Sequence, residues 1–430
     1  MKAAASLNSL ERFGWRFGLD SIRSLLVELD RPHQSLRFIH VAGSNGKGST
    51  CAFLASFFRQ SGYRTGLYTS PHLCDIRERF RMNGLWIPTK SFQRYSRQVL
   101  KACEKVRRKI GHSPTHFEAL TALAFLWFRD QKAEWVVLET GLGGRLDATN
   151  IIENPALCLI TPIGLEHQDI LGTTLKKIAW EKSGILKTGT PAVTYQPHLE
   201  ALQAIEKTAK EKDISLWTAG RDFSFKREAD GFRWKGPGLQ AHLKVPNLSN
   251  FQIANASLAL AGLQRLEADG ISSSTQRFEK SFREMKWPGR MEILQNQPLV
   301  LMDGAHNPEA AKGLAVALFQ KYPKKKWIVL NGFLKDKDYT SFAKILAPYT
   351  DLSIVTEPTN DRAEQGQRVF EAWERAETRS IWINDWQKAL ELGLEKAGSS
   401  SRLGLLITGS LYLLGDCRRH LIGTRGLKRI

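Results

Sequence analysis

A short glycine-rich segment carries the residues best suited to bind phosphate. Residues 43–50 read GSNGKGST, and they follow an apolar run, LRFIHV, at residues 36–41. Glycines let backbone N–H groups converge on an anion, Lys47 can neutralise a terminal phosphate, and the hydroxyl of Ser49 or Thr50 can reach Mg²⁺. A glycine separates this lysine from the hydroxyls, which departs from the GxxxxGK[ST] loop of ordinary kinases and GTPases. The order of strand, loop and helix predicts a nucleotide-phosphate site, and the alternative is a glycine-rich turn without a ligand.

Three polar side chains that could bind a metal ion stand at or after the ends of other apolar runs. Glu139 ends the run EWVVLE, Ser70 follows TGLYT beside a proline, and His167 comes shortly after LCLITPI. The carboxyl ends of parallel strands meet at one edge of a sheet, where ligands of open α/β folds bind. Hydroxyl and carboxylate oxygens suit Mg²⁺. Taken alone, Ser70 is also typical of a turn, Glu139 of a solvated strand end, and His167 of an ordinary core or surface histidine.

Short apolar runs alternate with helical patterns around these residues. We expect strands at residues 36–41, 65–69, 134–139, 157–163 and 191–194. We expect helices at residues 48–60, 116–129, 174–186 and 251–266. Continuous apolar strands with helices between them indicate a parallel sheet covered on both faces. Aromatic residues alternate with polar ones at residues 221–243, which predicts antiparallel hairpins.

A second α/β series follows the sequence WPGR at residues 287–290. Its apolar runs are PLVLMD, KWIVLNG, LSIVT, SIWIN and GLLITG, and no phosphate loop occurs among them. We therefore expect an α/β fold of two domains: residues 1–285 form a phosphate-loop ATPase domain on a parallel sheet, and residues 286–430 form a smaller Rossmann-like domain.

Composition and cysteine usage bound the class of protein. A chain of 430 residues with 42% hydrophobic and 24% charged residues is typical of two or three ordinary domains. The five cysteines form no CxxC pair, the N-terminus has no apolar segment of signal-peptide length, and no run of about 18 apolar residues occurs. We expect a cytoplasmic protein with reduced thiols and no membrane partner.

The formal net charge of +19 raises the alternative of a nucleic-acid-binding protein. Basic residues cluster at 101–109, 321–326 and 418–429, with no helix-turn-helix, zinc-finger or RNA-recognition motif between them. We interpret most of them as solvated faces that attract anionic ligands such as nucleotides and polycarboxylates. Nucleic acid is therefore not an expected partner.

The segments around the candidate residues resemble one enzyme family. GSNGKGST is similar to the GTNGKGS loop of the folylpolyglutamate synthase/dihydrofolate synthase family, the folate branch of the Mur ligase superfamily. Residues 138–150, LETGLGGRLDATN, resemble the family's LEVGLGGRLDATN with Thr140 in place of valine. Only residues 1–42 precede the loop, where most Mur ligases carry a separate domain, and this also favours the folate branch. The first domain is then Mur ligase-like, the second is a glutamate ligase domain, and the likeness covers nearly the whole chain.

Two further segments imply the metal ligands. SPHL, ERF and NG at residues 70–84 are similar to the family's SPHL…ERI…NG, and residues 166–185 to its LDHxxxLG…EKAGI. By these matches Ser70 and His167 hold Mg²⁺, together with Glu139, the strand-end carboxylate of LETGLGGRLDATN, and two Mg²⁺ sites are expected.

The same match implies a modified lysine. Lys182 stands where the family carries a lysine carbamate, and Glu166 stands where the family has aspartate, so its carboxylate reaches further. The alternative for Lys182 is an unmodified surface lysine paired with Glu181 or Glu166.

The resemblance also implies which residues bind ATP and the substrate. Asn255, the arginine of PGR and the DGAHNP segment match family residues near ATP, and FGLD and THFE match residues near the pterin, although THFE is also a helix capping box. The implied ATP-binding residues are Asn45, Gly46, Lys47, Gly48, Ser49, Asn255, Arg290, Asp303 and His306. The implied substrate-binding residues are Phe17, Gly18, Leu19, Asp20, Thr115, His116, Phe117, Glu118, Leu146, Asp147 and Ala148.

The resemblance implies an ATP-dependent ligase, and we expect it to be a monomer. A dihydropteroate or folate carboxylate takes the γ-phosphate of ATP to give an acyl phosphate, and L-glutamate then displaces phosphate, with Lys47, Glu139, His167 and Lys182 as the catalytic residues. The residues do not show whether the enzyme joins the first glutamate to dihydropteroate, adds later glutamates to folates, or does both. We expect a bifunctional enzyme. The alternatives are another Mur-type amino-acid ligase and a nucleic-acid-binding ATPase.

Overall fold

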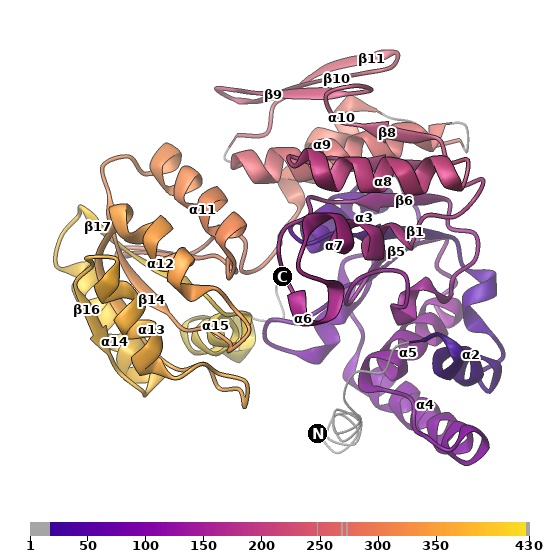
Figure 1. Cartoon of the computed structure of the whole chain (residues 1–430), viewed down its shortest axis with the longest axis horizontal. Helices are drawn as coiled ribbons and strands as arrows, with labels where there is room; N and C mark the ends of the chain where they lie inside the picture. Colours follow the sequence, from indigo (N-terminus) through magenta and orange to yellow (C-terminus); the bar gives the residue numbers. More distant parts are fainter. Residues whose placement is uncertain (1–17, 247, 268–269, 272–273, 427–430) are drawn as a thin grey trace. The chain divides into compact units, whose positions relative to one another are not determined.

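A computed structural model describes residues 18–246, 248–267, 270–271 and 274–426. The chain divides into two units: unit 1 is Met1–His72 with Ile76–Met285, and unit 2 is Leu73–Asp75 with Lys286–Ile430. Each unit has an α/β architecture built on its own sheet (Figure 1). Phe17, an expected substrate-binding residue, lies outside the described residues.

Unit 1 is built on an eight-stranded sheet of order β4-β3-β2-β5-β1-β6-β7-β8. Its strands are β1 (Phe38–Ala42), β2 (Thr65–Tyr68), β3 (Phe80–Met82), β4 (Leu85–Trp86), β5 (Trp135–Glu139), β6 (Leu157–Ile160), β7 (Ala192–Thr194) and β8 (Leu216–Thr218). Five neighbouring strands, in the order β2-β5-β1-β6-β7, are parallel, as predicted. The strand β8, which the sequence did not indicate, extends this parallel run, whereas β3 and β4 add an antiparallel edge. The apolar pattern did not indicate these two strands because they are three and two residues long.

Helices cover both faces of this sheet (Figure 1). They are α2 (Asp20–Val27), α3 (Lys47–Gln60), α4 (Thr89–Ile110), α5 (His116–Asp130), α6 (Gln168–Leu171), α7 (Leu175–Ser183), α8 (Leu199–Glu211), α9 (Asn250–Arg265) and α10 (Thr275–Glu284). Helix α5 is buried along most of its length because α2 and α4 pack against it. The predicted hairpins are confirmed as a three-stranded antiparallel sheet of β9 (Ser224–Glu228), β10 (Gly231–Gly236) and β11 (Leu239–Leu243).

Unit 2 carries a six-stranded sheet of order β12-β13-β17-β14-β15-β16. Its strands are β12 (Glu292–Asn296), β13 (Leu299–Met302), β14 (Lys326–Asn331), β15 (Thr350–Val355), β16 (Ser380–Trp382) and β17 (Leu403–Thr408), and its helices are α11 (Pro308–Lys321), α12 (Tyr339–Leu346), α13 (Gly366–Arg375), α14 (Trp386–Gly398) and α15 (Leu411–Gly426). The five predicted apolar runs form β13 to β17, which are parallel. The additional strand β12 is antiparallel and half-exposed, so it lacks an apolar run.

The central strand β1 buries a histidine that should make the fold sensitive to acid. His40 is fully buried, and its Nε2 lies 2.9 Å from Oγ1 of Thr149. Burial lowers the pKa of His40 from 6.5 to about 3, and the charge of Lys187 adds to this effect. Because the folded pKa lies below the unfolded one, the stabilisation is fully present above pH 6.5 and is lost as the pH falls towards 3.

We therefore expect the free energy of unfolding to fall by about 2 kcal/mol through His40 alone between pH 6.5 and 4.5. The His40→Gln variant, which cannot titrate, should show a correspondingly shallower pH dependence even if it starts less stable. Urea unfolding of both proteins across this pH range measures the difference. Parallel curves for the two proteins would rule out His40 as the cause.

Candidate active site

Three loops that carry predicted site residues emerge at the same edge of the unit 1 sheet. Strand β1 pairs in parallel with β5, with Val41 opposite Glu139, and with β6, with Ala42 opposite Ile160. The carboxyl ends of these strands therefore lie together. The phosphate loop follows β1, the glycine-rich loop follows β5, and the segment with Glu166 and His167 follows β6 (Figure 1).

The phosphate loop has a conformation and surroundings that require glycine. Gly43 has φ of +144°, and a Cβ there would lie 1.9 Å from Oγ1 of Thr161. Gly46 has φ of +89°, and a Cβ there would lie 2.2 Å from Oδ1 of Asn255. Side chains other than hydrogen are strained at such angles and would collide here. Helix α9 thus places the predicted residue Asn255, which is 5% exposed, directly against the loop.

Two lysines converge on one carbonyl group of this loop. Nζ of Lys47 donates to the carbonyl oxygens of Gly43 at 2.8 Å and Ser44 at 3.2 Å. Nζ of Lys182, from α7, donates to the same Gly43 oxygen at 2.8 Å. Two predicted residues that are far apart in the sequence therefore lie around one end of the phosphate loop.

Lys182 forms a buried ion pair with Glu166. The Lys182 side chain is 1% exposed, and its Nζ lies 2.9 Å from Oε1 of Glu166. Burial lowers the pKa of Lys182, and the charge of Glu166 opposes that shift. Burial alone would raise the pKa of Glu166, but Lys182, Lys47 and His167 hold it well below its usual range. The alternative of an unmodified surface lysine is wrong about the position of Lys182, because this side chain is buried. One of the two partners that this alternative named, Glu166, is indeed paired with it.

The predicted metal residues lie on two of these loops and on the loop after β2. The Ser70 backbone N–H donates to Oε2 of Glu139 at 3.0 Å, and Glu139 is 4% exposed at the end of β5. His167 is half-buried at the N-terminus of α6, and its charge is close enough to lower the pKa of Glu166. A buried carboxylate beside a serine is a donor set that fits a hard divalent cation.

Asp147 organises the glycine-rich loop. Its Oδ2 accepts hydrogen bonds from the N–H groups of Gly141 at 2.9 Å and Leu142 at 2.8 Å. Its Oδ1 accepts from the backbone N–H of Thr149 at 3.0 Å and from its hydroxyl at 2.5 Å. Burial raises the pKa of Asp147, and these hydrogen bonds oppose the shift. The geometry gives Asp147 a loop-shaping role in addition to the substrate contact that the resemblance implies.

The other residues expected on the substrate side form a small neighbourhood around the start of α5. Thr115 and Glu118 make the predicted capping box: the Glu118 N–H donates to Oγ1 of Thr115 at 3.2 Å, and the Thr115 N–H donates to Oε2 of Glu118 at 2.7 Å. Burial raises the pKa of Glu118, and its bonds to Thr115 and to the Ile22 backbone oppose this.

Aromatic packing connects this neighbourhood to the glycine-rich loop. A Cβ on Gly141 would lie 2.5 Å from the ring of Phe117, so the ring sits against the loop backbone. The remaining expected residues lie on elements around this helix. Gly18, Leu19 and Asp20 lie at the start of α2, which packs on α5, and His116 is the first residue of α5. Leu146 and Ala148 flank Asp147 in the sequence.

The predicted residues of unit 2 cluster after β13. Asp303 is 3% exposed, and its two oxygens accept hydrogen bonds from the N–H groups of Met291 at 2.9 Å and Ala305 at 3.0 Å. Burial raises the pKa of Asp303, and the charge of Arg290 opposes this. Nδ1 of His306 lies 2.8 Å from the Gly304 oxygen, and a Cβ on Gly304 would lie 2.8 Å from Nη1 of Arg290. The structure therefore brings Arg290, Asp303 and His306 together within unit 2.

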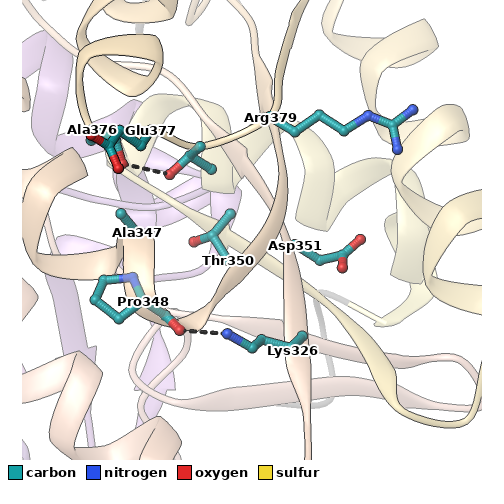
Figure 2. Close-up of a pocket in the computed structure, with 9 residues that line it drawn as sticks. Lys326, Ala347, Pro348, Thr350, Asp351, Ala376, Glu377 and Arg379 are labelled. Atoms are coloured by element: carbon teal, nitrogen blue, oxygen red, sulfur yellow. Dashed lines mark hydrogen bonds between the residues drawn. The ribbon is translucent and has the colours of Figure 1, made fainter.

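A cavity of about 430 Å³ also lies in unit 2 (Figure 2). Among its lining residues, Lys326 and Thr350 are the first residues of β14 and β15, and Arg379 directly precedes β16. Because Asp303 follows the carboxyl end of the parallel strand β13, the cavity lies at the opposite edge of this sheet. It is not part of the candidate site.

The sequence did not indicate several contacts that shape the site. The Pro162 carbonyl oxygen accepts from the N–H groups of Ser44 at 3.0 Å and Asn45 at 3.1 Å, and Thr161 closes against Gly43. Arg145 pairs with Glu181 at 2.9 Å and lies over the ring of Trp180. These contacts depend on strand order and loop path, for which the sequence offers no local signal.

Comparisons with known proteins identify relatives of this chain. The family described as "Mur ligase, glutamate ligase domain" matches residues 289–411. A dihydrofolate synthase/folylpolyglutamate synthase of Bacillus subtilis is 34% identical over 426 residues, which cover 95% of this chain and 96% of the relative. Among the described helices, none combines the length and apolar character needed to cross a membrane.

Two solved structures match both units of the chain. The Mycobacterium tuberculosis folylpolyglutamate synthase complexed with ADP has a TM-score of 0.89 and 28% identity, with 97% of this chain and 99% of that chain covered. A bifunctional folylpolyglutamate synthase/dihydrofolate synthase with Mn, AMPPNP and L-glutamate bound has a TM-score of 0.86 and 30% identity, with 97% and 98% covered. The phosphate loop, the glycine-rich loop and this likeness over nearly the full length show that the chain belongs to the folylpolyglutamate synthase/dihydrofolate synthase family of ATP-dependent ligases.

Proposed function

We propose that this protein joins L-glutamate to the carboxylate of dihydropteroate and of reduced folates, through an acyl phosphate formed with ATP. One carboxylate oxygen attacks the γ-phosphorus, and ADP leaves. The glutamate amine then attacks the acyl carbon, loses a proton, and displaces inorganic phosphate to leave an amide. The observation that carries the proposal is the gathering of Lys47, Lys182 and Glu139 at one edge of the unit 1 sheet, beside a loop shaped for phosphate.

The phosphate loop supplies the first step with positive potential. Backbone N–H groups at the start of α3 and the Lys47 ammonium group neutralise charge on the phosphates. Gly46 and Asn255 bring α9 close enough for Asn255 to contact the nucleotide. By the family likeness, Arg290, Asp303 and His306 of unit 2 also act on ATP, and the residues around Thr115, Phe117 and Asp147 act on the folate.

Ser70, Glu139 and His167 would hold a divalent cation. Mg²⁺, when bound, would neutralise charge on the transferring phosphoryl group. The Ser70–Glu139 contact and the burial of Glu139 support this assignment. A related structure that carries Mn with a nucleotide analogue supports it further.

Lys182 is proposed to act as a carbamate. The neutral amine adds to CO₂ and releases a proton, which converts a buried cation into an anion with two oxygens. Burial lowers the pKa of Lys182 and so favours the neutral amine that this addition needs. The ammonium form paired with Glu166 is the state before CO₂ adds, because the carbamate would place like charge beside that carboxylate.

A cytoplasmic location and a monomeric state complete the proposal. The cysteines described as free are all buried, and unpaired thiols are typical of a reducing compartment.

One assay separates the candidate functions. Purified protein with ATP, Mg²⁺ and L-glutamate is given dihydropteroate or tetrahydrofolate, and the products are identified by mass spectrometry. We expect both acceptors to gain glutamyl residues, with phosphate release that depends on glutamate. A product from only one acceptor would restrict the enzyme to one activity. Transfer of a different amino acid, or hydrolysis of ATP stimulated by DNA, would contradict the proposal.

The metal assignment predicts a selective effect of Glu139→Gln. This change removes the charge at nearly constant shape, so the Mg²⁺ concentration for half-maximal activity should rise about tenfold or more, while the KM for folate stays within about threefold. Glu134→Gln, at the exposed start of the same strand segment, is the control and should change neither quantity. An unchanged Mg²⁺ titration in Glu139→Gln would move the metal elsewhere.

A further inference from the structure

Helix α4 carries a line of basic side chains that the ligase reaction does not use. The helix contains eight lysines and arginines and a single acidic residue, Glu104. Six of the basic residues follow one another at intervals of three or four positions: Lys90, Arg94, Arg97, Lys101, Lys105 and Arg108. Residues at this spacing lie on one face of a helix, about 5–6 Å apart. We call these six residues the basic stripe.

The stripe is exposed, and α4 is anchored by its opposite face. Phe92, Tyr95, Val99, Ala102, Cys103 and Val106 are buried. Helix α4 packs on α2 and α5 and lies at the periphery of unit 1 (Figure 1). All six side chains of the stripe belong to exposed residues. The sequence indicated only the cluster at residues 101–109, because helical spacing spreads the rest of the line over the preceding turns.

Acidic neighbours offset only part of this charge. Arg94 lies 3.5 Å from Asp130 of α5, Lys105 lies 3.3 Å from Glu28 after α2, and Arg108 lies 3.3 Å from Glu104. The three basic side chains in these pairs are 59–78% exposed, and ion pairs in water contribute little. Lys90, Arg97 and Lys101 have no acidic partner within 4.0 Å among the residues that the structure describes.

The dimensions of the stripe suit a phosphate backbone. From Lys90 to Arg108 it extends about 27 Å along a rigid helix. The phosphates of one DNA strand are 3.4 Å apart along the duplex axis but wind around it, so a straight stripe of this length meets only part of the about eight phosphates that its length spans on each strand. None of the large apolar residues that the described chain exposes lies on α4. This argues against insertion into a lipid surface and against a protein interface with an apolar centre.

We propose that the basic stripe of α4 binds the sugar–phosphate backbone of a nucleic acid, without regard to base sequence. The positive charge of the whole chain, +19, adds long-range attraction to this local arrangement. None of the six residues belongs to the candidate active site. Binding is therefore expected to be independent of glutamate ligation and to depend steeply on salt.

Fluorescence anisotropy of the full chain with a labelled 20-base-pair DNA duplex of mixed sequence tests the proposal. With five or six phosphate contacts, the logarithm of the association constant should fall against the logarithm of salt concentration with a slope of about −5. Arg97→Glu combined with Lys101→Glu should weaken binding at least about tenfold and make the slope shallower by about 2. Ligase turnover should stay within about twofold.

Two controls separate the stripe from net charge and from the nucleotide site. Lys207→Glu with Lys210→Glu, on α8, changes the charge equally and should alter binding less than about twofold. Saturating ATP should leave the anisotropy signal in place. Equal losses in both double variants, displacement by ATP, absence of binding by the unchanged protein, or binding to phosphatidylserine vesicles but not to the DNA duplex would each overturn the proposal.

Discussion

Lys47→Ala should lower kcat for amide synthesis by about 10²- to 10³-fold or more. The Lys47 ammonium group is the positive side chain of the phosphate loop, and loss of one preorganised group that stabilises transition-state charge has effects of this size. The fold should persist, because Lys47 is only half-buried and its Nζ donates to carbonyl oxygens of its own loop. Steady-state kinetics and thermal unfolding of the purified variant measure both effects.

Arg59→Ala is the matched control for this variant. Arg59 lies in the last turn of the same helix, α3, where it pairs with Glu284, and its removal should leave turnover within about twofold. Near-normal turnover of Lys47→Ala would end the assignment of the phosphate loop.

Lys182→Ala should lose at least about 100-fold in turnover and recover part of it with added acetate. The added carboxylate would replace the oxygens of the proposed carbamate. Removal of dissolved CO₂ should also slow the unchanged enzyme, and bicarbonate should restore it. Because burial lowers the pKa of Lys182, the neutral amine and hence the carbamate should persist near neutral pH and be lost on acidification.

Two further variants separate the carbamate from charge and folding effects. Lys182→Arg keeps a cation beside Glu166 but cannot carry the carbamate, so it should be as inactive as Lys182→Ala. Unpaired Glu166 would cost about 3–5 kcal/mol in Lys182→Ala, and Glu166→Gln in the same chain removes that charge. Lys176→Ala, an exposed residue of the same helix, is the control. Full activity of Lys182→Arg would show that the cation, and not a carbamate, is what the reaction needs.

The sequence predicted the loops and strands of the site because these depend on local patterns. Continuous apolar runs predicted β1, β5 and β6, and glycine spacing predicted the phosphate loop after β1. Strand order then brings Glu139 and Glu166 to one edge, as expected for a parallel sheet. The capping box at Thr115 was also readable, since both partners lie within one helical turn.

Contacts between distant residues could not be predicted in the same way. The sequence offered both Glu181 and Glu166 as partners of Lys182, and only the packing of α7 on the loops shows that Glu166 is paired with a buried lysine while Glu181 pairs with Arg145. The four hydrogen bonds that Asp147 accepts depend on how the glycine-rich loop turns back on itself. The short edge strands β3, β4 and β12 lack a clear apolar pattern, and tertiary pairing determines them.

Transfer of ¹⁸O from the acceptor carboxylate tests the ligase reaction most directly. Dihydropteroate labelled in both carboxylate oxygens is incubated with the enzyme, ATP, Mg²⁺ and L-glutamate, and the phosphate and the amide product are analysed by mass spectrometry. Formation and displacement of an acyl phosphate predict one ¹⁸O atom in the released phosphate and one in the new amide, and no release without an acceptor. Unlabelled phosphate released during amide formation, or release that does not depend on glutamate, would contradict this account.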